Sequence, residues 1–342
     1  MFRTKRLKME NQKVKNIITI GASAGGLKAV STLLSSISKE LNAAIFIVIH
    51  LGKSALIETV INMLNKDSLM QVKIPEDGEI IQSGKVYLAP VDEHMIIERG
   101  KIKIAKGAAE NHWRPSIDVL FRTAAAAYDS CVTGIILSGL LDDGTSGMSA
   151  IKTAGGTCIV QEPGEAEFPE MPQNVINNIE VDYRVSIADI GYILSDIYSR
   201  GECIPSDVPA QIKLEAEIST RISSQYEQTK QLGEATAFTC PDCGGILTEI
   251  DEQGNKRYRC FTGHTFSPRL FEEVLTDKIE ETLWVAIRMM EERRNFISGM
   301  EQSFPATSLI SKERLKKASG LKVHIERMKE ILRHLTPSSP ED

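Results

Sequence analysis

Short apolar runs and segments with helical spacing alternate along the first 200 residues of the chain. An apolar run of about four to eight residues is typical of a strand buried on both faces, whereas apolar positions three and four residues apart predict a helix. Strands that alternate with helices predict a mostly parallel, doubly wound α/β sheet. The expected strands are 17–20, 44–49, 72–74, 85–90, 132–138 and 157–161, and the expected helices are 27–37, 56–64, 115–128, 147–154 and 187–198.

Two local features add detail to this pattern. Residues 95–104 form two short apolar stretches about Arg99-Gly100, which predicts an antiparallel hairpin attached to the sheet. Pro115 precedes a segment of helical spacing, and proline is well suited to the first turn of a helix. We therefore expect Pro115 to lie in that first turn.

The pattern changes beyond residue 200, and 342 residues leave room for modules beside one α/β domain of about 200 residues. Residues 201–236 are polar and poor in strands, which is typical of a linker, here with one partly helical stretch. Helical spacing returns near the end and is interrupted at Phe304-Pro305. The predicted parts are a tail 1–14, an α/β domain 15–200, a linker 201–236, a cysteine module 237–268 and an amphipathic helical segment 269–336.

Charge and composition exclude several classes of protein. The net charge of −6 argues against a general nucleic-acid binder, and the basic residues gathered in the first fifteen positions predict a solvated tail. No apolar run reaches the ~18 residues of a membrane span, and the N-terminus lacks a signal-peptide core, so we expect no membrane insertion and a cytoplasmic location. Cys131, Cys158 and Cys203 are interpreted as small core residues in a reducing compartment.

The first predicted strand ends in a glycine-rich turn, Gly21-Ala-Ser-Ala-Gly-Gly26, with Ser23 at its tip. Such a turn between a strand and a helix serves either a dinucleotide phosphate or a catalytic nucleophile. A dinucleotide site needs a carboxylate at the end of the second strand, but that strand ends in His50. Ser23 and His50 therefore predict nucleophilic catalysis, while a histidine that merely ends a strand remains the alternative.

A serine–histidine pair needs a third group that orients the imidazole, most often a carboxylate. Asp142 and Asp143 follow the strand 132–138, so either can reach the same edge of the sheet. Asp143 is favoured because Gly144 allows a sharp turn after it. The alternative is an Asp-Gly turn in which Asp142 caps the next helix.

A cluster of cysteines predicts a metal site. Cys240-Pro-Asp-Cys243 and Cys260-Phe-Thr-Gly-His264 flank a hairpin-like stretch. Three thiolates and one imidazole suit a closed tetrahedral zinc site, and four protein ligands leave no position open for catalysis. The prediction is a zinc-ribbon module with a structural zinc ion; free thiols or a disulfide are the alternatives.

Several motifs together resemble the catalytic domain of the CheB-type protein-glutamate methylesterases. They are Gly21–Gly26, His50, His112-Trp-Arg-Pro-Ser-Ile-Asp118, Leu137–Met148, Gln161-Glu-Pro163 and Met171-Pro172, in order over about residues 15–200. The resemblance implies a doubly wound fold that hydrolyses methyl esters of glutamate side chains on chemoreceptors, and in many members deamidates glutamines. It implies a triad of Ser23, His50 and Asp143 and an oxyanion hole from the backbone of Ala24 and Leu140.

The chain also departs from the family pattern. Ala24 stands where threonine is common, and Leu140 where methionine is common; backbone donors survive both changes. The typical enzyme carries an N-terminal receiver domain, whereas here the catalytic domain begins at about residue 15, so we expect that control to be absent unless a partner protein supplies it. Zinc-ribbon tails of this kind resemble those on some stand-alone members.

His112 and Arg114 form a second constellation, interpreted either as a pair lining the substrate crevice or as part of a loop held by Pro115. Two other classes of function compete with the esterase. One is a catalytically silent signalling adaptor, which would have no need of the three catalytic side chains. The other is an amidase acting on a different substrate. The sequence does not identify the receptor, the regulator or the oligomeric state.

Overall fold

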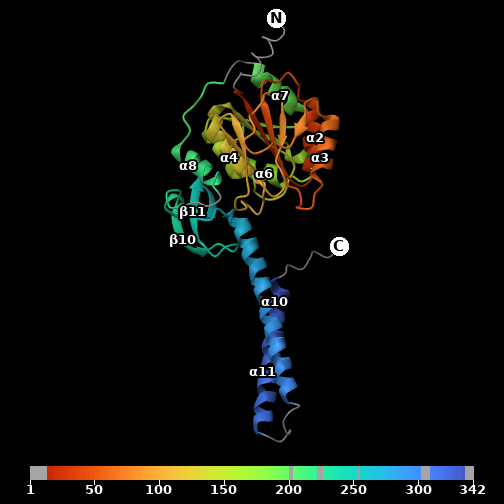
Figure 1. Ribbon diagram of the computed structural model, residues 1–342, viewed down its shortest axis with the longest axis vertical. Coiled ribbons are helices and arrows are strands. Elements are labelled where there is room, and N and C mark those ends of the chain that lie inside the picture. Colours follow the sequence, from red (N-terminus) through yellow and green to blue (C-terminus); the bar gives the residue numbers. More distant parts are fainter. Residues whose placement is uncertain (1–13, 200–202, 222–225, 253, 302–308, 336–342) are drawn as a thin grey trace. The chain divides into compact units, whose positions relative to one another are not determined.

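The computed structural model describes residues 14–199, 203–221, 226–252, 254–301 and 309–335 (Figure 1). The chain divides into two compact units, Met1–Pro268 and Arg269–Asp342. Residues 1–13 of the predicted tail and the predicted break at Phe304-Pro305 lie outside the described residues.

The first unit is built on a seven-stranded sheet whose neighbouring strands all pair in parallel. β1 is the central strand, and it pairs with β2 on one side and with β7 on the other. The strands, in their order across the sheet, are β3 (Val72–Lys73), β4 (Val86–Leu88), β2 (Ala44–Ile49), β1 (Ile17–Ala22), β7 (Val132–Ile136), β8 (Thr157–Gln161) and β9 (Tyr183–Val185).

Helices cover both faces of this sheet, each over its own apolar core (Figure 1). Such a layered arrangement confirms the predicted doubly wound α/β fold. β9 and α6 were not predicted, because both are short and Met171-Pro172 interrupts the apolar spacing at the start of α6. One face carries α2 (Gly26–Ser36), α3 (Ile57–Asp67) and α7 (Ile187–Ser199), and the other carries α4 (Ile117–Tyr128), α5 (Thr145–Thr153) and α6 (Glu170–Asn178).

Two predictions about local structure are wrong. β5 (His94–Glu98) and β6 (Lys101–Ala105) form the expected hairpin, but it is a separate two-stranded sheet packed on α4. The backbone N–H of Ile102 in β6 donates to the carbonyl of Glu79 in a loop, not to a strand of the seven-stranded sheet. Pro115 does not lie in the first turn of α4. It precedes Ser116, which caps the helix by accepting a hydrogen bond from the backbone N–H of Val119.

Part of the predicted linker 201–236 packs on the α/β domain. α8 (Ala210–Ser219) contacts α4, and Ile212 joins the core beneath it. α9 (Tyr226–Thr229) follows, and β10 already begins at Glu234. The sequence misses this packing because α8 is not strongly amphipathic and buries the charged residue Glu215.

The interpretation of the scattered cysteines is wrong for two of three. Cys131, at the end of a short 3-10 turn η1 (Asp129–Cys131), forms a disulfide with Cys203, with a Cα–Cα distance of 5.4 Å. The two cysteines are 72 positions apart, and no spacing in the sequence links them. Cys158 is a buried free thiol, as predicted. Cysteine usage therefore gives no argument for a reducing compartment.

A four-stranded antiparallel sheet follows, in the order β10-β11-β12-β13. The predicted hairpin is its centre, β11 (Ile246–Glu252) with β12 (Asn255–Cys260), and β10 (Glu234–Thr239) and β13 (Thr265–Phe266) add a strand on each side. We call β10–β13 and their connections the ribbon.

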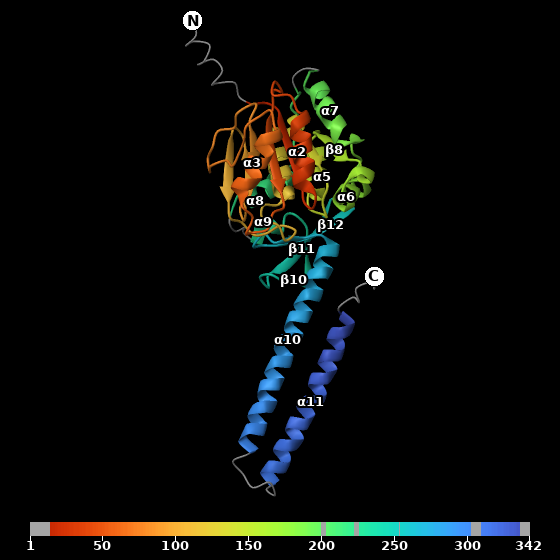
Figure 2. The ribbon, with the colours of Figure 1, turned by 90° about the vertical axis from the view of Figure 1, so that its right-hand side faces the viewer.

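The second unit contains two long helices, α10 (Pro268–Glu301) and α11 (Leu309–Leu335), lying side by side (Figure 2). Ile287 packs against Ile325 and Leu332 between them, and Lys329 forms an ion pair with Glu291 at 3.2 Å. Among the described residues, every helix is too short or too polar to cross a membrane.

Candidate active site

Three side chains meet where the central strands of the sheet end. Ser23 follows β1, His50 follows β2, and Asp143 lies in the loop after β7. The register aligns them, because Ala22 pairs with Ile49 and the N–H of His50 donates to the carbonyl of Ala22 at 3.0 Å. The carboxyl ends of parallel strands, at the point where the chain switches sides, are where open α/β sheets place ligands.

The His50 ring lies between Ser23 and Asp143. Its Nε2 is 2.8 Å from Oδ2 of Asp143, and its Nδ1 is 3.2 Å from Oγ of Ser23. Asp143 accepts several other hydrogen bonds as a carboxylate, so Nε2 carries the proton and Nδ1 accepts from the serine hydroxyl. The two ring nitrogens thus exchange the roles that they have in chymotrypsin-like enzymes, while the order of the groups is unchanged.

Asp143 is buried and surrounded by donors. Its Oδ2 accepts from the N–H of Ile117 at 2.7 Å, and its Oδ1 accepts from Ser116 Oγ at 2.9 Å and Asn111 Nδ2 at 3.2 Å. Burial alone would raise the pKa of Asp143, but His50, Ile117 and Asn111 together hold it below its ordinary value. The site therefore keeps a charged carboxylate behind the imidazole.

A second buried carboxyl, Asp118, lies beside Asp143. Its Oδ1 accepts from the N–H groups of Gly144 and Gly147 at 3.0 and 2.6 Å, and Asn111 donates to its Oδ2 at 2.9 Å. Burial and the neighbouring charge of Asp143 raise the pKa of Asp118. Two close carboxyls cannot both ionise easily, so the arrangement favours charge on Asp143.

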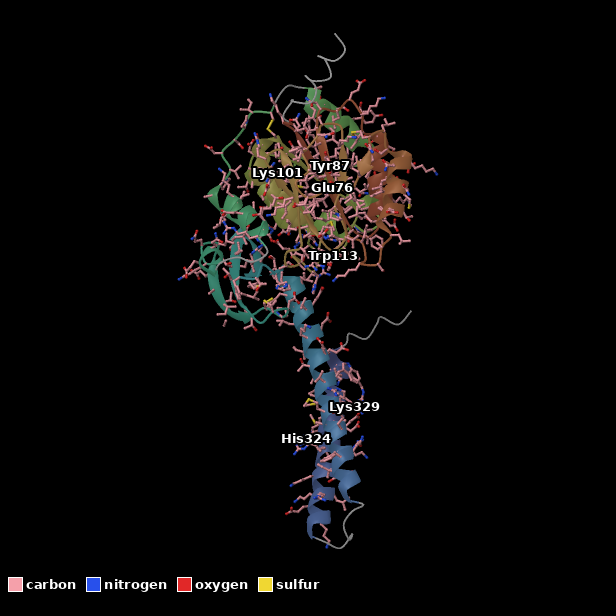
Figure 3. All side chains as sticks on the ribbon, in the orientation of Figure 1. Glu76, Tyr87, Lys101, Trp113, His324 and Lys329 are labelled. Atoms are coloured by element: carbon pink, nitrogen blue, oxygen red, sulfur yellow. A yellow bond between two sulfur atoms is a disulfide. The ribbon has the colours of Figure 1, made fainter. Side chains whose placement is uncertain are left out.

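Trp113 covers the imidazole. The two rings are stacked, with centroids 4.0 Å apart and an interplanar angle of 7°. Trp113 lies at the lower edge of the α/β domain in the view of Figure 3. Sequence reasoning assigned no role to Trp113, Asn111 or Ser116; the signal that could have found them is their position in and beside the 112–118 motif.

The backbone N–H groups around Ser23 fall into two sets, those that donate to a carbonyl and those that do not. The N–H of Ser23 donates to Ser138 O and that of Gly139 to Phe168 O, both at 3.0 Å. Within the described part of the chain, the N–H groups of Ala24 and Leu140 donate to no acceptor. A Cβ on Gly139 would lie 2.9 Å from Cβ of Ser23, so only glycine lets this backbone approach the serine so closely.

A groove of about 640 Å³ opens beside Ser23 and His50. It runs between α2 and α3, and Lys28, Met63 and Lys66 contribute to its walls. The serine thus lies at the end of a surface groove that offers both apolar and cationic contacts.

The pair His112 and Arg114 does not line this groove. Arg114 binds Asp92 Oδ1 through Nε and Nη2, at 3.1 and 2.7 Å, and the carbonyl of Gly107 at 2.6 Å. His112 is exposed and meets the ring of Phe266 edge-on. Both side chains thus have partners away from Ser23.

The four predicted metal ligands gather at one end of the ribbon. Their ligand atoms all lie within 4.8 Å of one another. Cys243 Sγ is 3.7 Å from Cys260 Sγ, and His264 Nδ1 is 3.7 and 3.6 Å from the sulfurs of Cys240 and Cys260. Tetrahedral zinc with ordinary Zn–S and Zn–N bonds requires separations of about 3.5–3.8 Å. The donor set and its spacing therefore fit a metal ion.

Comparison with known proteins agrees with this geometry. The family model described as CheB methylesterase matches residues 18–194. A Leptospira interrogans protein, provisionally named a protein-glutamate methylesterase/protein-glutamine glutaminase, is 40% identical over 174 residues, which cover 51% of this chain and 90% of that protein. The Salmonella typhi protein-glutamate methylesterase/protein-glutamine glutaminase is 33% identical over 194 residues, 56% of this chain and 55% of that protein.

A solved structure shows the same fold. The catalytic domain of the Thermotoga maritima CheB methylesterase has 31% sequence identity and a TM-score of 0.51, and the match covers 53% of this chain and 98% of that domain. The matched family region ends at residue 194, before α8 and the ribbon. The match over half of the chain confirms the resemblance found in the sequence, and the chain belongs to the CheB methylesterase family.

Proposed function

We propose that this protein is a serine hydrolase that removes methyl esters from glutamate side chains of a chemoreceptor or a related signalling protein. The observation that carries the proposal is the hydrogen-bonded series Ser23, His50 and Asp143 at the ends of β1, β2 and β7. The names of the relatives support the same reaction and extend it to the deamidation of glutamine, which proceeds through the same acyl-enzyme.

In the proposed mechanism, His50 Nδ1 takes the proton of Ser23 as Oγ attacks the side-chain carbonyl. Asp143 stabilises the imidazolium that forms. The N–H groups of Ala24 and Leu140 hold the oxyanion; removing one such donor typically costs about 10²–10³ in rate. The protonated imidazole then returns its proton to the leaving methoxide, and water, activated by His50, releases the glutamate.

We further propose that the Cys240, Cys243, Cys260 and His264 cluster holds a zinc ion. Three thiolates favour zinc over hard cations such as magnesium. All four ligands come from the protein, so the ion is structural. Native mass spectrometry of the full chain should give a mass increase of one zinc ion that disappears in Cys260→Ser.

The proposed activity is tested by methanol release from methylated receptor preparations. Ser23→Ala should abolish release. Ser35→Ala is the matched control and should leave release unchanged, because Ser35 is an exposed serine of α2 outside the groove, and its hydroxyl donates to the carbonyl of Thr32 at 2.7 Å. Equal release by wild type and Ser23→Ala would exclude the assigned nucleophile. No release by folded, metal-loaded wild type would favour the adaptor.

A further inference from the structure

The loop of residues 110–113 contributes two groups to the candidate active site. Asn111 Nδ2 donates to Asp143 and to Asp118, and the Trp113 ring stacks on His50. The loop closes on itself, since Glu110 and Trp113 exchange backbone hydrogen bonds at 3.2 and 2.9 Å. Its position therefore bears directly on the orientation of His50 and on the charge of Asp143.

This loop does not have a relaxed backbone. Asn111 has φ 50° and His112 has φ 65°, and non-glycine residues in this region cost roughly 1–3 kcal/mol each. Such conformations persist when the surroundings hold them.

The ribbon contacts the loop through its last strands. The N–H of Asn111 donates to the carbonyl of Thr265 in β13 at 2.8 Å. Arg259 Nη1 in β12 donates to Glu110 Oε1 at 2.8 Å, and Phe266 meets the His112 ring with centroids 6.3 Å apart. Three consecutive loop residues are thus held by one short segment of the ribbon.

A fourth contact reaches the other active-site loop. Ser267 Oγ donates to Asp142 Oδ2 at 2.6 Å, immediately before Asp143 in the chain. All four contacts come from residues 259–267, and this segment also contains two of the four metal ligands, Cys260 and His264. The metal cluster and the contacts to the active site therefore share one piece of chain.

Buried ion pairs stabilise the contact between the ribbon and the 110–113 loop. Glu110 is shared between Arg259 and Arg122 of α4, whose Nη1 lies 3.0 Å from Glu110 Oε2. All three side chains are almost completely buried. Burial alone would raise the pKa of Glu110, but the two guanidinium groups hold it well below the ordinary range. Glu110 is therefore a charged link between the α/β domain and the ribbon.

We propose that the ribbon is a positioning element for the hydrolase: its segment 259–267, ordered by the bound metal, holds the 110–113 loop and so sets the His50 ring and Asp143. This inference rests on the proposed function for its kinetic consequence. Its structural part, the coupling between the ribbon and Trp113, does not. Arg259 is a positioning residue, and the metal takes no part in the chemistry.

The expected consequence is a hydrolase that depends on a metal outside its active site. Displacing a catalytic group by about 1 Å can cost roughly 10²-fold in rate. Loss of the metal should therefore lower kcat by about 10²-fold. KM should change much less, because the groove between α2 and α3 is not part of the ribbon contact.

The experiment uses the full chain with Trp284→Phe. The protein has two tryptophans, so this variant leaves Trp113 as the only indole. Metal is removed with a chelator and restored with Zn²⁺, while indole emission, circular dichroism, kcat and KM are recorded. Arg259→Gln provides a second perturbation, Arg259→Lys tests rescue of the charged link, and Lys256→Ala is the matched control on the exposed side of β12.

Removal of the metal and Arg259→Gln should each change the emission of Trp113 as its stack on His50 opens, and should lower kcat while the α/β dichroism is retained. Added Zn²⁺ and Arg259→Lys should reverse much of these effects, and Lys256→Ala should show neither. Unchanged emission and kcat in both perturbations would overturn the proposal. If wild type releases no methanol, the proposed function fails, and the emission still decides whether the ribbon positions the loop.

Discussion

The seven-stranded sheet and the ribbon achieve their structures by different physical means. β1, for example, has Ile17, Ile18 and Ile20 fully buried, and apolar cores lie on both of its faces. The ribbon buries few apolar side chains, among them Leu247 and Ile250, and combines them with buried ion pairs and a group of three cysteines and one histidine whose spacing fits a metal ion. Hydrophobic burial tolerates small shifts, whereas metal ligation and buried charge are lost almost completely when one partner is removed.

The difference separates two tasks within one site. The sheet places Ser23 and His50 by strand register, which follows from the apolar pattern itself. The loop that bears Asn111 and Trp113 depends on partners distant in the sequence. A variant in the sheet should therefore change either the rate of the reaction or the global stability. A variant in the ribbon should change both, because the ribbon acts through its contact with the 110–113 loop.

The largest effect is expected at Asp143, the carboxylate that accepts a hydrogen bond from His50. Asp143→Asn places an amide where His50 Nε2 donates, so the imidazole loses the partner that selects its tautomer. We expect kcat to fall by about 10⁴-fold, equivalent to about 5 kcal/mol of transition-state stabilisation. Single-turnover measurements would check this. A loss of less than tenfold would show that Asp143 does not orient the imidazole.

Removing a buried charge in the ribbon contact should have the next largest effect. Glu215 binds Arg257 and lies 3.5 Å from Arg122 Nε. Glu215→Gln leaves these guanidinium groups less compensated, and breaking a buried pair typically costs about 3–5 kcal/mol. Chemical unfolding at neutral pH would measure the loss.

The same group predicts a dependence of stability on pH. Burial alone would raise the pKa of Glu215, but Arg257 and Arg122 lower it from 4.5 to about 2. Because the pKa is lower in the folded state, the stabilisation is fully present above pH 4.5 and is lost as the pH falls toward 2. The unfolding free energy of Glu215→Gln should fall less over this interval than that of wild type; parallel curves would contradict the assignment.

A smaller effect is expected at Gly144, the N-cap of α5 in the loop that follows β7. Its φ is 97°, and a Cβ would lie 2.6 Å from Cδ1 of Ile136. Gly144→Ala should cost about 2–4 kcal/mol, from the left-handed backbone and from overpacking. Gly78→Ala is the matched control, because Gly78 has φ 79° but nothing within 4 Å of the new Cβ. Thermal unfolding should separate the two, and equal losses would show that packing contributes nothing.

The smallest effect is expected for an exposed pair in the ribbon. Lys256 Nζ lies 2.7 Å from Glu249 across β11 and β12, and both side chains are partly exposed to solvent. Solvent screens such pairs, so Lys256→Ala should leave the unfolding midpoint unchanged within error. A clear shift would mean that the ribbon depends on surface charge as well as on its buried network.

Much of the sheet and of the candidate site could be predicted because the relevant information is local. The apolar runs that form β1 and β2 end at Ser23 and His50, and strand pairing then brings these residues together. The glycine after Asp143 favours it over Asp142 in the sequence, and His50 contacts Asp143 in the structure, whereas Asp142 contacts Asn174 and Ser267. The four candidate metal ligands, which the structure brings together, follow from two short spacings in the sequence.

The features that the sequence does not predict depend on contacts between segments that are distant in the chain. The stack of Trp113 on His50 and the hydrogen bond from Asn111 to Thr265 join residues with no common periodicity. The Cys131–Cys203 disulfide likewise leaves no pattern in the sequence.

The sequence by itself determined the parallel sheet, the positions of Ser23 and His50 at its edge and the grouping of the cysteines, because hydrophobic periodicity and short ligand spacings act over a few residues. Only the tertiary structure decided where the 110–113 loop lies. That loop adopts left-handed backbone conformations at Asn111 and His112, and its partners are provided by another module. Packing between modules, rather than local preference, gives the site its final geometry.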